Sequence, residues 1–137
     1  MLIDTNIILD VVLGRSPWEA AASRLLDLVS RSRINGFVSA HAITTVHYLV
    51  ERERSRGVAR TAVADLLSIV DVVPVDRADL LRALSLEVRD FEDAVHVAAA
   101  LRVGAEWIAT RDVRHYRTSP VACRSAVELV ALLAAPT

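Results

Sequence analysis

Short apolar runs alternate with longer amphipathic segments along this chain. The short runs suit buried strands, whereas the longer segments repeat apolar side chains at the helical spacing. Strands are expected near residues 1–4, 36–39, 71–75, 106–110 and 121–123. Helices are expected near residues 17–32, 41–55, 58–69, 77–88, 91–103 and 125–134. This alternation predicts an α/β fold, with a parallel sheet of about five strands and helices on both faces.

Local signals mark several of the expected element boundaries. Ser16 is expected to cap a helix whose first turn contains Pro17. Arg56 and Gly57 are expected to form a turn. Gly104 is expected to end the helix that precedes it.

The segment from Ala94 to Leu101 is apolar nearly all round, apart from His96. A helix of this kind is usually buried between other elements. Asp93 stands at the front of this helix, which is a rigid place from which to aim a carboxylate.

Composition indicates one cytoplasmic domain that spans residues 1–137. A single cysteine, Cys123, cannot form an internal disulfide, which suits a reducing compartment. The chain opens on a strand-like segment rather than on a signal sequence, and no apolar run approaches the roughly 18 residues that cross a bilayer. We therefore expect no membrane partner.

Charge excludes some functions. The net charge of −1 does not suit a polycation that binds nucleic acid in bulk. All 16 basic residues are Arg. Receiver domains and phosphatases of the haloacid-dehalogenase type usually need a Lys beside their acidic cluster, so this chain fits neither.

Acidic residues occur near three expected element boundaries. Asp4 follows the first strand, and ligands of open α/β sheets bind at the carboxyl ends of strands. In the alternative interpretation, Asp4, Thr5 and Asn6 form a turn or cap the next helix. Asp90 and Asp93 lie on one face of a helix start, where they form a capping arrangement, supply ligands, or do both.

Asp112 follows another expected strand, and the hydroxyl of Thr110 is expected to orient it. Arg111, Arg114 and Arg117 flank this acid. Two interpretations stay open for these arginines, namely ion pairing with Asp112 and binding of substrate phosphates.

The histidines give weaker signals. His41 and His47 are six residues apart on one helix, which is not metal-ligand spacing. His96 stands three residues after Asp93, and two interpretations stay open for it: a residue that supports the acid, or, as we expect, a partly buried structural histidine. Gathered carboxylates repel one another and usually share a hard cation, so the acids predict a metal-dependent enzyme.

Three motifs together resemble the PIN domain, and in particular the small VapC-like ribonucleases that act as toxins of toxin–antitoxin modules. The motifs are Asp4-Thr5-Asn6, Asp93-Ala94 and Thr110-Arg111-Asp112. The resemblance covers nearly the whole chain. Each motif is weak alone, but their order and spacing are fairly specific. The resemblance implies a three-layer sandwich and RNA cleavage with Mg²⁺ or Mn²⁺.

The resemblance also implies roles for particular residues. Asp4, Asp93 and Asp112 would be catalytic, and Asp4 and Asp93 would bind the metal. The supporting residues would be Thr5, Asn6 and Thr110, and Asp90, at the same helix end as Asp93, would compensate for the lower number of acids in this chain. Apart from the resemblance, metal-assisted hydrolysis of RNA is the expected mechanism, in which Arg111, Arg114 or Arg117 would hold the RNA backbone.

Partners follow from the same resemblance, which implies a homodimer and a cognate antitoxin. Apolar side chains are expected to form either the antitoxin groove or ordinary core. They are Trp18, Leu25 and Leu26, or Val46 and Tyr48.

The chain departs from the family pattern at two places. Thr45 stands where many relatives carry a Glu, six residues after a Ser like Ser39. His115-Tyr116 stands where some relatives have Asp-Phe. These departures leave an alternative open, namely a catalytically degenerate PIN-like module that acts through RNA or protein contacts.

Overall fold

The computed structural model describes residues 1–134 and contains a five-stranded sheet in that range. The strands are β1 (Leu2–Ile3), β2 (Phe37–Ser39), β3 (Asp71–Val73), β4 (Trp107–Ala109) and β5 (Ala122–Arg124). Their spatial order is β3-β2-β1-β4-β5, and every neighbouring pair is parallel.

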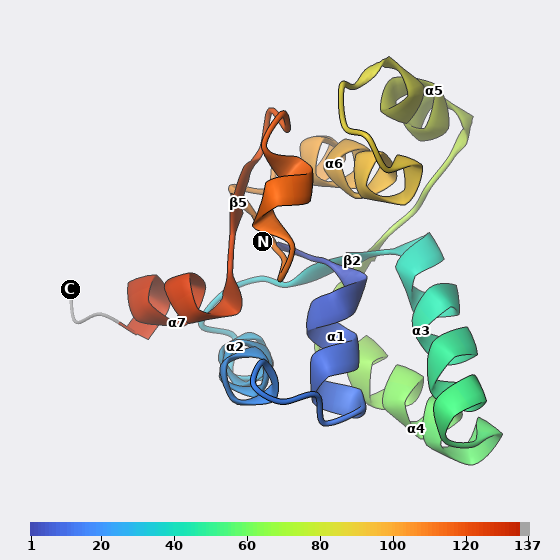
Figure 1. Cartoon of the computed structure of the whole chain (residues 1–137), viewed down its shortest axis with the longest axis vertical. Coiled ribbons are helices and arrows are strands. Elements are labelled where there is room, and N and C mark those ends of the chain that lie inside the picture. Colours follow the sequence, from blue (N-terminus) through green and yellow to red (C-terminus); the bar gives the residue numbers. More distant parts are fainter. Residues whose placement is uncertain (135–137) are drawn as a thin grey trace.

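Helices cover both faces of this sheet, as the sequence predicts (Figure 1). They are α1 (Thr5–Val12), α2 (Glu19–Ser30), α3 (Ala40–Glu53), α4 (Arg56–Leu67), α5 (Arg77–Ser85), α6 (Phe91–Val103) and α7 (Ala126–Ala134), with a 3₁₀ turn, η1, at Val113–Tyr116. Helices α5 and α6 lie on one face, and the other α-helices lie on the opposite face. The fold is therefore a three-layer sandwich.

The central strands are apolar on both sides because each contributes side chains to two hydrophobic cores. Ile3 and Ala109 pack into the core that contains α1, α2 and α3. Leu2 and Ile108, one position earlier, pack against α6 on the other face. Successive side chains of a strand point to opposite faces, so a strand buried on both faces reads as a continuous apolar run.

Helix α1 was missed in the sequence analysis. Its run of Ile7, Ile8 and Leu9 resembles a strand, because β-branched side chains favour extended backbone. All three side chains are at most 4% exposed, so they pack fully in the core. Burial of this apolar face outweighs the local preference.

Two expected boundaries were also wrong. Helix α2 begins at Glu19 with Trp18 in the N-cap position, so Ser16 does not cap it. The ring of Trp18 instead lies under the guanidinium of Arg111, 4.0 Å from it, which anchors the turn outside the helix. Arg56 and Gly57 open α4 rather than form a turn, since the Ser55 hydroxyl caps that helix.

Helix α6 has the buried character that its composition predicts. Val97, Ala98 and Ala100 are fully buried, and their small or compact side chains allow close approach to β1 and β4. Gly104 ends the helix with a φ of +64°, a left-handed conformation that glycine adopts readily. Among the described residues, no helix is both long and apolar enough to cross a bilayer.

Sheet order positions the functional site. From β1 the chain moves outward to β2 and β3, then returns across β1 to β4 and β5. The carboxyl ends of β1 and β4 therefore form the point where strand order reverses, which is the usual ligand site of such sheets. Asp4 follows β1 and Thr110 follows β4, and the Asp4 amide donates to the Ala109 carbonyl at 2.9 Å.

Candidate active site

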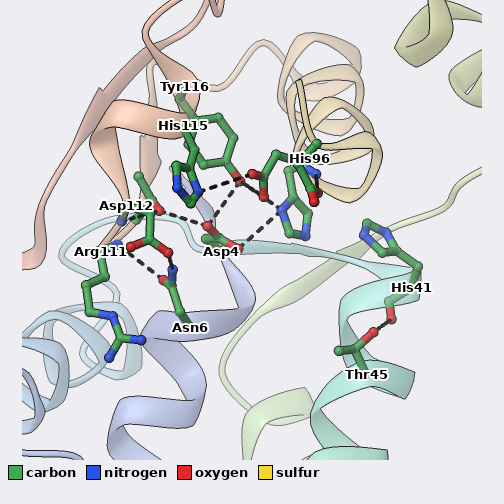
Figure 2. Close-up of polar contacts among 12 residues, drawn as sticks. Asp4, Asn6, His41, Thr45, His96, Arg111, Asp112, His115 and Tyr116 are labelled. Carbon is green, nitrogen blue, oxygen red and sulfur yellow. Dashed lines mark hydrogen bonds and ion pairs between the residues drawn. The ribbon is translucent and has the colours of Figure 1, made fainter. Parts of the chain in front are cut away.

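Asp4 is a buried carboxylate that does not serve as a helix cap. It occupies the N-cap position of α1, yet its side chain makes no capping bond and is 5% exposed. Its Oδ2 atom accepts hydrogen bonds from Thr110 Oγ1 at 2.8 Å and from the Tyr116 hydroxyl at 3.0 Å (Figure 2). Of the two interpretations of Asp4, the structure supports the one that directs it into a polar site.

Asp90 and Asp93 divide the two roles expected at the start of α6. Asp90 caps the helix, because its Oδ1 accepts from the Asp93 amide at 3.0 Å. The Asp93 side chain does not reach back to the cap. Its Oδ1 accepts from the Tyr116 hydroxyl at 3.1 Å, so this carboxylate joins Asp4.

Tyr116 connects the two acids. It lies in η1, is 2% exposed, and places its hydroxyl within hydrogen-bond distance of Asp4, Asp93 and Nδ1 of His96, the last at 3.1 Å. Burial and the two carboxylates raise the pKa of Tyr116, so its hydroxyl stays protonated and remains a donor. In the sequence, Tyr116 stands out only as a departure from the family pattern, because nothing local in His115-Tyr116 points to Asp4.

His96 is part of the site rather than only a core residue. It is 1% exposed, and its Nδ1 lies 3.3 Å from Asp4 Oδ1. Its ring stacks on that of His41, from α3, with centroids 4.7 Å apart. The sequence contains one signal for this role, because His96 follows Asp93 by three positions and both side chains therefore lie on one face of α6.

These residues form a group suited to a divalent cation. Asp4, Asp93 and His96 each offer one ligand atom, and the three atoms lie within 4.8 Å of one another. Carboxylate oxygens suit Mg²⁺ and Mn²⁺, and an imidazole nitrogen is a ligand that transition metals accept more readily. The donor set therefore fits the cation that the sequence predicts.

Asp112 lies beside this group rather than within it. Its amide donates to Thr110 Oγ1 at 3.0 Å, and its Oδ2 accepts from Asn6 Nδ2 at 3.0 Å (Figure 2). The three acids expected in one pocket are therefore not all together. Asp4 and Asp93 lie with His96, and the Thr110 hydroxyl lies between Asp4 and the backbone amide of Asp112. Thr5 is also buried, but its hydroxyl has no hydrogen-bond partner within residues 1–134, so its supporting role stays a prediction.

Arg111 makes an ion pair, but not with the acid that follows it. Its guanidinium contacts Asp10 Oδ1 at 2.9 Å and lies over Trp18. Burial raises the pKa of Asp10, and the charge of Arg111 opposes this shift. The side chain of Arg111 therefore ties β4 to α1, and its binding of RNA stays a prediction.

Other basic residues line a cavity beside the acid pair. The cavity has a volume of about 610 Å³, and it is bordered by Glu87, Arg89, Asp90, Arg114, His115, Arg117 and Thr118. His115 is exposed, and its Nδ1 lies 3.8 Å from Asp93 Oδ2. The cavity therefore adjoins the carboxylate of Asp93 and carries three arginines.

Thr45 does not replace the missing acid. Its hydroxyl donates to the carbonyl of His41 at 3.1 Å, one turn earlier in α3 (Figure 2). This is an ordinary contact within a helix.

The chain matches a known protein family. A family model described as "PIN domain" matches residues 1–114. The chain belongs to the PIN domain family.

Known PIN-type proteins resemble the chain over most of its length. The chain is 21% identical over 121 residues to "Ribonuclease VapC1" of Aquifex aeolicus (strain VF5), covering 85% of this chain and 83% of that protein. Its fold is similar to VapBC2 from Rickettsia felis, solved bound to a DNA fragment from the promoter, with a TM-score of 0.72, 12% identity, and coverage of 90% and 96%. It is also similar to Mycobacterium tuberculosis VapC20, described as a sarcin-ricin loop cleaving toxin, with a TM-score of 0.64, 19% identity, and coverage of 78% and 85%.

The PIN site of this chain holds two carboxylates close together, and the pKa of Asp93 responds to this arrangement. Burial, followed by the charge of Asp4, raises the pKa of Asp93 to about 6, although the hydrogen bond from Tyr116 opposes the shift. A group whose pKa is raised by folding stabilises the fold while it is protonated. This stabilisation is present below about pH 4 and is lost as the pH rises through about 6.

We predict that Asp93→Asn stabilises the metal-free protein at pH 7. The amide keeps an acceptor for Tyr116 and removes the charge, so the gain should be on the order of 1 kcal/mol after solvent screening, or a few degrees in Tm. Thermal unfolding in a chelating buffer measures it. The difference between variant and wild type should shrink as the pH falls to about 4. A variant less stable than wild type at pH 7 would contradict the interpretation that the charge of buried Asp93 beside Asp4 destabilises the metal-free fold.

Proposed function

We propose that this chain is a metal-dependent endoribonuclease, the toxin of a toxin–antitoxin module, which hydrolyses RNA phosphodiester bonds. One observation carries the proposal, namely that the carboxylates of Asp4 and Asp93 converge on one hydroxyl at the switch point of the sheet. Two of the similar proteins, a ribonuclease and a loop-cleaving toxin, agree with it.

The chain's own residues supply distinct functions in this proposal. Asp4 and Asp93 would hold a Mg²⁺ or Mn²⁺ ion, which supplies stabilisation of phosphate charge and a more acidic water, and the Nδ1–H of His96 would orient Asp4. Thr110 and Tyr116 keep Asp4 in place through hydrogen bonds. Asp112, which Asn6 and Thr110 position, would orient the attacking water.

The first test is RNA cleavage by Asp4→Asn. Because a catalytic cation stabilises the transition state by several kcal/mol, the variant should lose about a hundredfold or more in cleavage rate. A fluorogenic RNA assay with Mn²⁺ or Mg²⁺, repeated with a chelator, measures this loss. Asp27→Asn is the control, since the side chain of Asp27 is exposed on α2 and pairs with Arg31 alone among residues 1–134. Equal cleavage by wild type and Asp4→Asn would remove Asp4 from the chemistry.

The basic cavity next to Asp93 is proposed to hold the RNA backbone. Arg89, Arg114 and Arg117 line it beside His115, and guanidinium groups bind phosphates through paired hydrogen bonds. This proposal gives Arg114 and Arg117 the phosphate-binding role that the sequence left open for them, and it adds Arg89.

Arg114→Gln should weaken RNA binding and make it less sensitive to salt. Each lost phosphate contact on a single strand should lower the slope of log K against log salt by roughly 0.7. Fluorescence anisotropy at several salt concentrations, in an Asp4→Asn background that prevents cleavage, measures both effects. Arg60→Gln, an exposed change on α4, is the control. A parallel loss of affinity with an unchanged slope would argue against a phosphate contact.

A groove on the opposite part of the molecule is proposed to receive an apolar segment of the antitoxin. It has a volume of about 660 Å³ between α1, α2 and α4, and its walls include Ile8, Val11, Leu26 and Val58. Of the side chains considered from sequence, only Leu26 contributes to this groove, whereas Leu25 and Val46 are fully buried core. The homodimer stays a prediction, which light scattering decides by a mass of twice 15.0 kDa.

Val58→Asp should weaken antitoxin capture. Val58 is 45% exposed on the groove wall, so a charge there should disturb binding more than folding. Co-purification of the tagged chain with its co-expressed antitoxin measures the capture. Val72→Asp is the matched control, since Val72 is 42% exposed on β3 and outside the groove. If both variants capture the antitoxin equally well, the groove is not its site.

The alternative function, a degenerate PIN-like module, is not favoured by the comparisons or by the contacts within residues 1–134. The acid pair would have to lack metal affinity for that alternative to hold. Calorimetric titration with Mn²⁺ separates the two, because a binding module would show no site that Asp93→Asn abolishes. The cytoplasmic location expected from sequence stays a prediction.

A further inference from the structure

The imidazole ring of His96 has a second nitrogen, Nε2, that the proposed nuclease chemistry does not use. Around this ring, His41 from α3, and Glu92 and His96 from α6, each offer one ligand atom, and these atoms lie within 4.8 Å of one another. Figure 2 shows the ring of His41 beside that of His96, on the side away from Tyr116. Two imidazoles and a carboxylate thus meet where α3 approaches the first turns of α6.

Buried nitrogen atoms in this group lack partners. His96 is 1% exposed, and its Nε2 makes no hydrogen bond within residues 1–134. Both ring nitrogens of His41 are likewise buried and unpaired in this part of the chain. An unpaired buried polar atom destabilises a fold, because it has lost its hydrogen bonds to water without replacement. A ligand that these nitrogens bind would remove this penalty.

The hydrogen bonding of His96 leaves Nε2 ready to bind a metal. Its Nδ1 lies 3.3 Å from Asp4 Oδ1 and 3.1 Å from the Tyr116 hydroxyl. A histidine that ligates a metal commonly donates its other ring N–H to a carboxylate, which fixes the tautomer and the ring orientation. With the proton on Nδ1, the Nε2 lone pair is free for a ligand on the His41 side.

We propose that His41, Glu92 and His96 form a second metal site, selective for a transition-metal ion of the Zn²⁺ type. Two imidazoles and one carboxylate match the ligand preference of zinc, whereas Mg²⁺ prefers an all-oxygen shell. Glu92 is exposed, so an ion can reach the site from solvent. The proposal goes beyond the nuclease function and does not depend on it.

The bound ion would have a structural consequence next to the acid pair. It would join α3 to the start of α6, the helix that carries Asp93. It would also keep the Nδ1–H of His96 directed at Asp4. His96 would then belong to two sites, through one ring nitrogen each.

Zinc titration in an Asp93→Asn background tests this site separately from the nuclease site. That substitution removes a carboxylate of the acid pair and leaves His41, Glu92 and His96 in place. Isothermal calorimetry with Zn²⁺ should show one site. His41→Ala and Glu92→Gln should each weaken it by about tenfold or more, as loss of a ligand requires. His47→Ala, on the same helix α3, should bind zinc like the parent.

Several results would overturn the proposal. They are the absence of a zinc site in the Asp93→Asn protein, or an effect of His41→Ala or Glu92→Gln no larger than that of His47→Ala. If His41→Ala does not fold, as judged by circular dichroism, the exposed Glu92→Gln decides alone. Visible absorption of bound Co²⁺ gives a second measure, since its bands should change in the ligand variants and persist in His47→Ala. Failure here would leave the Asp4-dependent cleavage test unaffected.

Discussion

The structure depends on placing two carboxylates side by side in a largely buried position. Asp4 is 5% exposed and Asp93 faces it across a single hydroxyl. Charged groups lose hydration when buried and repel one another, so the fold must surround them with donors. Thr110 and Tyr116 supply hydroxyl donors from two segments that follow β4. The strand order, the burial of α6 and the position of η1 all serve to bring these groups together.

This arrangement sets stability against function. Each donor favours the charged form of the carboxylates, whereas burial and mutual repulsion favour a proton on Asp93, whose pKa is raised to about 6. A divalent cation would satisfy both carboxylates at once and remove the repulsion. The metal-free site therefore stores unfavourable electrostatic energy, which is the common condition of a functional site in an otherwise consistent fold.

Local signals in the sequence were enough for some features and insufficient for others. The Asp90 cap, the Gly104 terminus and the buried α6 depend on neighbours within a few residues, so sequence predicted them. Tyr116 was not recognised, because its partner Asp4 is 112 positions away and aromatic residues are most often core. His41 was set aside on its spacing to His47, yet its relevant neighbour is His96 on another helix. Contacts between segments carry this information, and single-sequence patterns do not.

The two departures from the family pattern acquire a common meaning in three dimensions. Thr45 removes a carboxylate from α3, and the Tyr116 hydroxyl stands between the remaining acids. The histidines, His96 and His41, surround the same region with nitrogen donors. Fewer carboxylates lower the negative charge that holds Mg²⁺, while imidazole nitrogens strengthen binding of softer ions such as Zn²⁺. The same edge of the sheet therefore presents nitrogen donors beside its oxygen donors.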